Sequence, residues 1–218
     1  MAEEKTATQM TTNPVFQPTM VALVGRARAG KDSAADAIVE ASEGRFRVER
    51  MAAPVKAAVC ALFGLEPADV EDGGRKDAPH PRCGGRTPRE AMVWLTAATK
   101  AFVGHDDFFA QKLLREVELL REVEEGGGHP LELGVVIPDV RYPADVEAIR
   151  RRGGAAVRVL KIRRGGAGGQ QQQQQQQQQH PWEAEIDGIQ GDACIDNDGT
   201  EEQLRARVLQ ALGMMRPF

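Results

Sequence analysis

The sequence predicts an α/β fold, a doubly wound parallel sheet of about five strands with helices on both faces. Two observations lead to this prediction. Short apolar runs of strand length alternate along the chain with segments of helical periodicity. The run 133–139 is apolar up to its last residue, which is typical of a strand buried on both faces in a parallel sheet.

Apolar runs and helical periodicity place the individual elements. Strands are expected at about 20–24, 46–51, 133–138, 156–162 and 192–195. Helices are expected at about 31–41, 52–63, 87–102, 105–126, 143–151 and 200–212. The segment 66–88 is rich in proline and glycine and lacks apolar periodicity, so we expect a mobile loop there.

Capping patterns support two of the helix starts. Thr87 precedes Pro88, and Glu90 follows at the position that closes a capping box. Thr200 and Gln203 form the same kind of pair before the last helix. The apolar stripes of three helices are expected in the core: Met92, Leu95, Thr99 and Phe102; Leu113, Leu114, Val117 and Leu120; and Leu204, Val208 and Leu212.

Composition limits the class of protein. The 218 residues suffice for one α/β domain, expected at 19–218 behind a disordered tail at 1–18. The net charge of −4 favours neither nucleic acid nor a membrane as a partner, and no apolar run reaches spanning length. Scattered cysteines indicate free thiols in the cytoplasm and speak against a zinc site. Ten glutamines at 170–179 predict a disordered tract.

A glycine-rich loop lies between the first expected strand and helix. Gly25 and Gly30 frame it, and Lys31 follows, giving the spacing G-x-x-x-x-G-K. Such a loop turns its backbone N–H groups toward phosphate oxygens, and the helix dipole faces the same anion. The hydroxyl expected after the lysine comes one place later, at Ser33, because Asp32 intervenes. The alternative interpretation is a glycine-rich surface turn.

Other polar residues are expected beside this loop. Asp139 and Arg141 follow the buried strand 133–138. In a doubly wound sheet, ligands bind at the carboxyl ends of the strands, so these residues and Gly25 should converge there.

The chain resembles the deoxynucleoside monophosphate kinases of phages and large DNA viruses over about 20–65 and 85–212. The matching stretches are 30–36, 53–56, 136–141, the pair His180 and Glu183, and 196–202. The resemblance implies a P-loop NTPase fold with an acceptor-binding region at about 45–130 and a mobile lid at about 161–185. The glutamine tract would lengthen that lid. The segment 66–88 departs from the pattern, so the base that is accepted stays open.

The resemblance also implies a reaction, the transfer of the γ-phosphoryl group of MgATP to a deoxynucleoside 5′-monophosphate. The residues implied in catalysis are Lys31, Arg141, Arg163 and Arg164. Those implied in ATP binding are Gly25, Arg28, Ala29, Gly30, Lys31, Asp32 and Ser33, with Asn197 and Gly199 at the adenine. The acceptor would contact Lys56, Arg89, Asp139 and Arg141, and Mg²⁺ would be held near Ser33 and Asp32 through phosphate or water.

Several alternatives stay open at this point. Phosphomevalonate kinases show a similar pattern, and a catalytically silent P-loop interaction protein fits the same motifs. Single residues have alternatives of their own: a helix-capping carboxylate for Asp139, a surface cation for Lys56, a structural salt bridge for Arg89 and an ordinary turn for Asn197. A GTPase is excluded because no Asn-Lys-x-Asp occurs. The expected partners are nucleotides and, for a homodimer, a second copy, in the host cytoplasm if the protein is viral.

Overall fold

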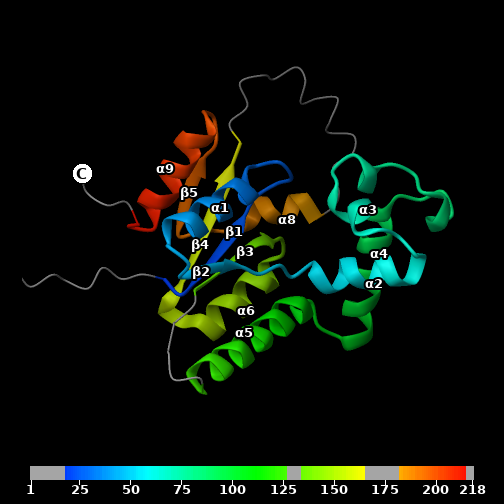
Figure 1. Ribbon diagram of the computed structural model, residues 1–218, viewed down its shortest axis with the longest axis horizontal. Coiled ribbons are helices and arrows are strands. Elements are labelled where there is room, and N and C mark those ends of the chain that lie inside the picture. Colours follow the sequence, from blue (N-terminus) through cyan, green and yellow to red (C-terminus); the bar gives the residue numbers. More distant parts are fainter. Residues whose placement is uncertain (1–17, 127–133, 165–181, 215–218) are drawn as a thin grey trace, which may run out of the picture.

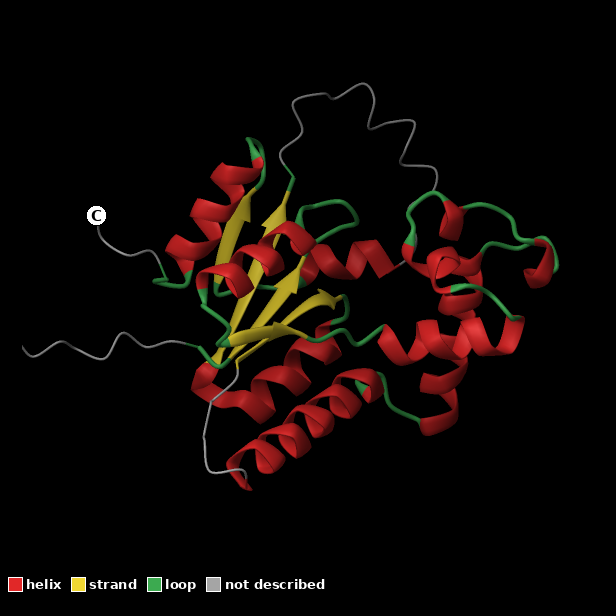
Figure 2. Cartoon of the chain, in the orientation of Figure 1, coloured by secondary structure: helices red, strands yellow, loops and turns green. Residues whose placement is uncertain are grey.

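A computed structural model describes residues 18–126, 134–164 and 182–214. The glutamine tract and all but the last residue of the expected tail lie outside these ranges. The described residues form one five-stranded parallel sheet in the order β2-β3-β1-β4-β5 (Figure 2). Its strands are β1 Met20–Val24, β2 Phe46–Val48, β3 Gly134–Val140, β4 Val157–Arg163 and β5 Ala193–Asp196. The predicted parallel α/β sheet is therefore confirmed.

Helices connect the strands. They are α1 Lys31–Ala41, α2 Ala53–Phe63, α3 Pro67–Glu71, α4 Pro88–Val103, α5 Phe108–Gly126, α6 Pro143–Gly153, α8 Trp182–Gly188 and α9 Glu201–Ala211. Short 3₁₀ turns are η1 Arg75–Asp77, η2 Pro81–Cys83 and η3 Gly154–Ala156. Both predicted capping boxes, at Thr87 and at Thr200, are present. Of the expected lid, 161–163 belongs to β4, and most of the remainder lies outside the described ranges.

The helices cover both faces of the sheet (Figure 1). Alternate residues of β1 divide between two cores because side chains along a strand point to opposite faces. Val21 and Leu23 pack with α1 and α9, whereas Ala22 and Val24 pack with α5, α6 and α8. The residues predicted to face inward from the last helix, Leu204 and Val208 of α9 and Leu212 directly after it, are all buried. The two cores hold β1 at the centre of the sheet, with the loop that follows it at the sheet's carboxyl edge.

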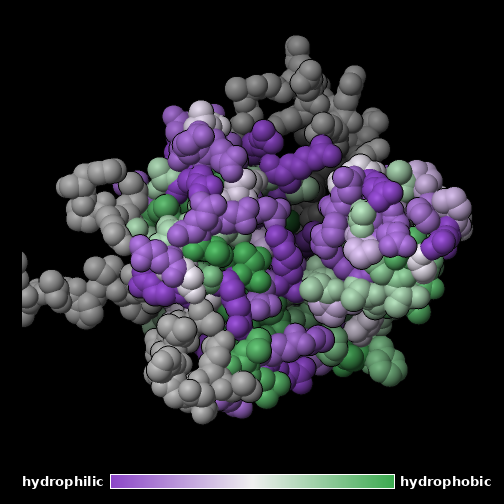
Figure 3. All heavy atoms as spheres, in the orientation of Figure 1, coloured by the Kyte–Doolittle hydropathy of each residue, from purple (hydrophilic) through white to green (hydrophobic). Residues whose placement is uncertain are grey.

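A smaller group of helices, α2 to α4, lies to one side of the sheet (Figure 1). The segment 66–88 was expected to be a loop, and this was wrong. It contains α3, η1 and η2, and Val70 of α3 is buried in a separate cluster with residues of α2 and α4. The five residues of α3 are too few to show helical periodicity, which is why the pattern did not predict it. Figure 3 shows weakly apolar side chains gathered along α2.

Two of the expected core stripes are only partly buried. In α4 the side facing α2 begins with the buried Ala91, but Phe102 near its end is 92% exposed and Trp94 is exposed as well. In α5, Leu113, Leu114 and Val117 are buried as predicted, whereas Leu120 is exposed. A periodic pattern identifies the apolar face of a helix but cannot show how much of that face other elements cover. No helix within the described ranges is long and apolar enough to cross a membrane.

The carboxyl-terminal ends of β2 and β3 differ from the predicted ones. β2 ends at Val48, three residues earlier than expected, and β3 continues to Val140. One residue of β1, Leu23, faces two of β3, Pro138 and Asp139, because Ala22 pairs with Ile137 and Val24 with Val140. This bulge lies at Pro138, which has no N–H to donate to a neighbouring strand. The irregularity comes directly before the polar end of β3.

Asp145 is a buried carboxylic acid in the first turn of α6. It accepts a hydrogen bond from the backbone N–H of Tyr142 (3.2 Å), and the ammonium of Lys100 lies 3.7 Å from the centre of the Tyr142 ring. Burial raises the pKa of Asp145 from an ordinary value of 3.8 to about 6, although Lys100 opposes the shift. Because the folded state holds this proton more tightly than the unfolded state does, the stabilisation is present at low pH and is lost as the pH rises through about 6.

Replacing Asp145 by asparagine should remove this pH dependence. A shift of this size corresponds to about 3 kcal/mol, so the wild type should lose up to that much free energy of unfolding between about pH 4 and pH 7 relative to the variant. Urea unfolding across this range measures the difference, with Asp36→Asn, at an exposed position of α1, as the control. Parallel pH profiles for the wild type and Asp145→Asn would contradict the assignment.

Candidate functional site

The crevice expected at the carboxyl edge of the sheet lies between β1 and β3. The chain leaves β1 for α1 on one face of the sheet and leaves β3 for α6 on the other. Connections that diverge from neighbouring strands leave a crevice at their carboxyl ends, where ligands bind in this architecture. Val24 and Val140, the last residues of the two strands, are paired. The loop after β1 and the polar end of β3 therefore meet, as predicted.

The glycine loop, residues 25–30, depends on glycine at both ends. A Cβ atom on Gly25 would lie 2.4 Å from the carbonyl oxygen of Ile162. Gly30 has φ +99°, and a Cβ there would lie 2.6 Å from Nδ2 of Asn197 and 2.8 Å from a methyl carbon of Leu204. The loop is thus packed against β4 and α9, and neither position has room for a side chain.

Lys31 begins α1 and turns back over the glycine loop. Its Nζ donates hydrogen bonds to the carbonyl oxygens of Gly25 and Arg26, each at 2.8 Å. The ammonium group therefore lies at the mouth of the loop, where the amino end of α1 also points. Ser33 is half-buried in the first turn of the same helix. Asp32 is exposed and pairs with Arg50 at 2.8 Å, so it would have to leave that arginine to approach a metal ion.

Asn197 supports the loop from the end of β5. Its side-chain Nδ2 donates to the carbonyl oxygen of Ala29 at 2.9 Å, and its backbone N–H donates to the carbonyl oxygen of Arg163 at 2.6 Å. This residue was expected at an adenine, but the structure places its amide against the loop backbone. Gly199 lies in the following turn, where a Cβ would collide with the Gln203 amide of the α9 capping box.

Asp139 holds the start of α2. Its Oδ1 accepts the backbone N–H of Met51 at 3.1 Å, and its Oδ2 accepts that of Ala52 at 2.8 Å. This is the helix-capping arrangement that the sequence left open, with the carboxylate supplied by a different element. Asp139 therefore ties the sheet to the α2–α4 group. Arg141 follows β3 directly and is half-buried at the same edge of the sheet.

The two acceptor cations expected in the α2–α4 group both have carboxylate partners. Lys56 of α2 pairs with Glu71 at 2.5 Å, and Arg89 of α4 forms a two-bond contact with Asp77, one bond measuring 3.1 Å. The salt bridge left open as an alternative for Arg89 is thus present. Lys76, next to Asp77, was not among the predicted acceptor residues. The segment 66–88 has no periodic pattern, so its sequence does not show which of its side chains lie close together.

The two arginines expected to clamp the transferring group separate at the end of β4. Arg163 donates from Nε to Oδ1 of Asp196 on the neighbouring strand at 3.0 Å. Arg164 donates to the carbonyl oxygen of Arg28 in the glycine loop at 3.3 Å. Successive residues at the end of a strand point in opposite directions, so only one of the pair reaches the loop. The structure brings Arg164 to the glycine loop, whereas Arg163 pairs with Asp196.

A contact that sequence reasoning missed links the glycine loop to α8. The guanidinium of Arg26 donates two bonds to Asp187, at 3.2 and 2.5 Å, and holds the pKa of that carboxyl below its usual range. Lys161 of β4 donates to the carbonyl oxygens of Asp187 and Ile189 at 2.7 and 2.9 Å. The contact joins residues 161 positions apart, and no local signal predicts such a pair.

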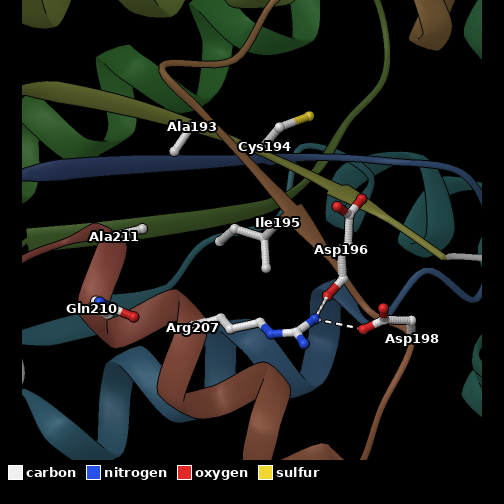
Figure 4. A pocket seen from close by; sticks show the side chains of 8 residues that line it. All are labelled: Ala193, Cys194, Ile195, Asp196, Asp198, Arg207, Gln210 and Ala211. Carbon is white, nitrogen blue, oxygen red and sulfur yellow. Dashed lines mark hydrogen bonds and ion pairs between the residues drawn. The ribbon is translucent and has the colours of Figure 1, made fainter.

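An open pocket of about 370 Å³ lies elsewhere, between the edge strand β5 and α9 (Figure 4). Arg207 crosses it to the carboxylate of Asp198 at 2.6 Å and to the backbone carbonyl of Asp196. None of the predicted site residues lines this pocket. In the part of the chain that the structure describes, no three His, Cys, Asp or Glu side chains gather as a metal-binding group.

Comparisons with known proteins do not identify a family. Neither the protein-family models nor the curated proteins that were searched contain a match to this chain. The function is therefore inferred from the glycine loop, from Lys31 and Arg164 that contact it, and from Arg141 at the neighbouring end of β3.

Proposed function

We propose that the protein is a kinase that transfers the γ-phosphoryl group of MgATP to a deoxynucleoside 5′-monophosphate. The observation that carries the proposal is the glycine loop. Gly25 and Gly30 have no room for side chains, and the ammonium of Lys31 lies across the loop at the amino end of α1. Backbone amides, a helix dipole and a fixed cation together favour a polyphosphate.

The donor side of the crevice needs few further groups. Lys31 would exchange its two carbonyl partners for the β- and γ-phosphate oxygens. Arg164, already hydrogen-bonded to the loop at Arg28, would neutralise charge on the same phosphates. Mg²⁺, when bound, would neutralise the charge that develops on transfer. Ser33 in the first turn of α1 would hold it, directly or through water.

The acceptor side lies between the end of β3 and the α2–α4 group. An acceptor phosphate is already anionic, so the chain needs no general base and must instead position two negative groups in line. Arg141 at the end of β3 and the cations Lys56 and Arg89 supply the compensating charge. Asp139 acts as a positioning residue in this proposal, because its carboxylate fixes the start of α2 relative to β3.

An ADP-release assay with MgATP tests the proposal. The acceptors are the four deoxynucleoside 5′-monophosphates, the matching ribonucleotides and phosphomevalonate. We expect turnover with at least one deoxynucleotide and a lower kcat/KM with phosphomevalonate. If phosphomevalonate is the only acceptor that is turned over, the acceptor is a phosphorylated mevalonate and not a nucleotide. ATP binding without turnover on any acceptor would contradict the proposal and favour the catalytically silent interaction protein.

A further inference from the structure

Three cations gather between α2, η1 and α4. They come from three elements and include a residue that the acceptor prediction omitted: Lys56, Lys76 and Arg89. Glu71 and Asp77 are their carboxylate neighbours, through the Lys56–Glu71 and Arg89–Asp77 pairs. Lys76 donates a long bond from Nζ to the backbone carbonyl of Glu71 at 3.4 Å. We call Lys56, Lys76 and Arg89 the cation cluster.

The cations of this cluster are less exposed than the acids that pair with them. The side chains of Lys56 and Arg89 are 20% and 21% exposed, whereas those of Glu71 and Asp77 are 61% and 40% exposed. An ion pair at a surface contributes little to stability. In both pairs the side chain that carries the positive charge is the more covered partner, and the carboxylate side chain is the more exposed one.

Lys76 adds a third positive charge to the cluster, beside the carboxylates of Glu71, Asp72 and Asp77. It is half-buried, and burial lowers the pKa of its ammonium; repulsion from Arg89 and Lys56 lowers it further. The hydrogen bond from Arg89 lowers the pKa of the Asp77 carboxyl, and the charges of Arg89, Lys76 and Arg28 lower it further. The cation cluster therefore combines three positive charges with two paired carboxylates, and Asp72 lies beside Lys76 as a third acid.

We propose that Lys56, Lys76 and Arg89 bind the phosphate of a phosphate monoester dianion, with Glu71 and Asp77 occupying the place of its oxygens until it binds. This assignment rests on the proposed function, for which it identifies where the acceptor's phosphate is held. The planar fork of Arg89, now filled by Asp77, matches two phosphate oxygens. The two lysines act as point charges on the remaining oxygen and on the second negative charge.

The first test is direct binding, without ATP, to the full chain. Titration calorimetry with each of the four deoxynucleoside 5′-monophosphates and with inorganic phosphate compares the wild type with Lys76→Met. We expect Kd for the monophosphate that binds most tightly to rise about fivefold, and Lys76→Arg to restore most of the affinity. Arg75→Met is the matched control, because it removes a charge from the same turn but from a residue that pairs with Asp69. Its Kd should stay within about twofold of wild type.

The second test separates binding from a structural role. Asp77→Asn removes the carboxylate that competes with the phosphate, so we expect the monophosphate to bind two- to threefold more tightly. If the Arg89–Asp77 pair only held the fold together, this variant would bind less tightly and melt at a lower temperature. Unchanged affinity in Lys76→Met, or weaker affinity in Asp77→Asn, would overturn the assignment.

Binding and catalysis can fail separately. If a monophosphate binds in a Lys76-dependent way but no acceptor is turned over, the anion site is supported and the proposed kinase activity is contradicted. If an acceptor is turned over with the same KM in Lys76→Met and wild type, the kinase activity is supported and this site is contradicted.

Discussion

Replacing Lys31 by alanine should lower the rate of phosphoryl transfer by roughly a thousandfold, which corresponds to about 4 kcal/mol of transition-state stabilisation. Lys31 is held by two carbonyl oxygens of the glycine loop, so its charge is in place before a nucleotide binds. A preorganised cation in a phosphoryl-transfer site costs no reorganisation during the reaction. Alanine keeps the helix start but removes the charge.

The measurement is kcat with saturating MgATP and acceptor, together with urea unfolding to show that the fold is kept. Lys112→Ala is the matched control, because this lysine lies on α5 and pairs there with Glu116 on the same helix. It should have wild-type kinetics. Activity of Lys31→Ala near that of the control would remove the basis for assigning the glycine loop to phosphate.

Replacing Arg141 by lysine should raise the acceptor's KM, or lower kcat, by about tenfold or more, with little change in ATP affinity. Arg141 follows β3 at the crevice, beside the end of β1 from which the glycine loop leaves. An arginine grips a phosphate with two parallel hydrogen bonds, and lysine keeps the charge but cannot reproduce that fork. The change therefore tests geometry rather than charge.

Two titrations distinguish the donor from the acceptor. A nonhydrolysable ATP analogue and each deoxynucleoside monophosphate are titrated separately into wild type and Arg141→Lys. Arg115→Lys, at an exposed position of α5, is the control for the exchange itself. If the affinity for the analogue collapses while that for the monophosphate holds, Arg141 belongs to the donor side and the two substrates have been placed in reverse.

Local pattern determined most of the fold. The apolar runs at β1, β3 and β4 and the capping boxes at Thr87 and Thr200 predicted their elements because strand burial and helix capping are properties of neighbouring residues. The glycine spacing predicted the loop for the same reason. Even the meeting of Gly25 with the end of β3 followed from the sequence, since parallel strands bring their carboxyl ends to one edge.

Only the tertiary structure determined the partners of the polar side chains at the carboxyl edge of the sheet. Asp139 binds the amides of Met51 and Ala52, and Asn197 holds the loop at Ala29, because distant elements place backbone groups within their reach. Lys76 joins the cation cluster through α3 and η1, whose five and three residues are too short to leave a periodic signal. Periodicity and capping report on contacts within a few positions along the chain. The partners of a polar side chain depend instead on how whole helices and strands pack together. The sequence by itself did not show this packing.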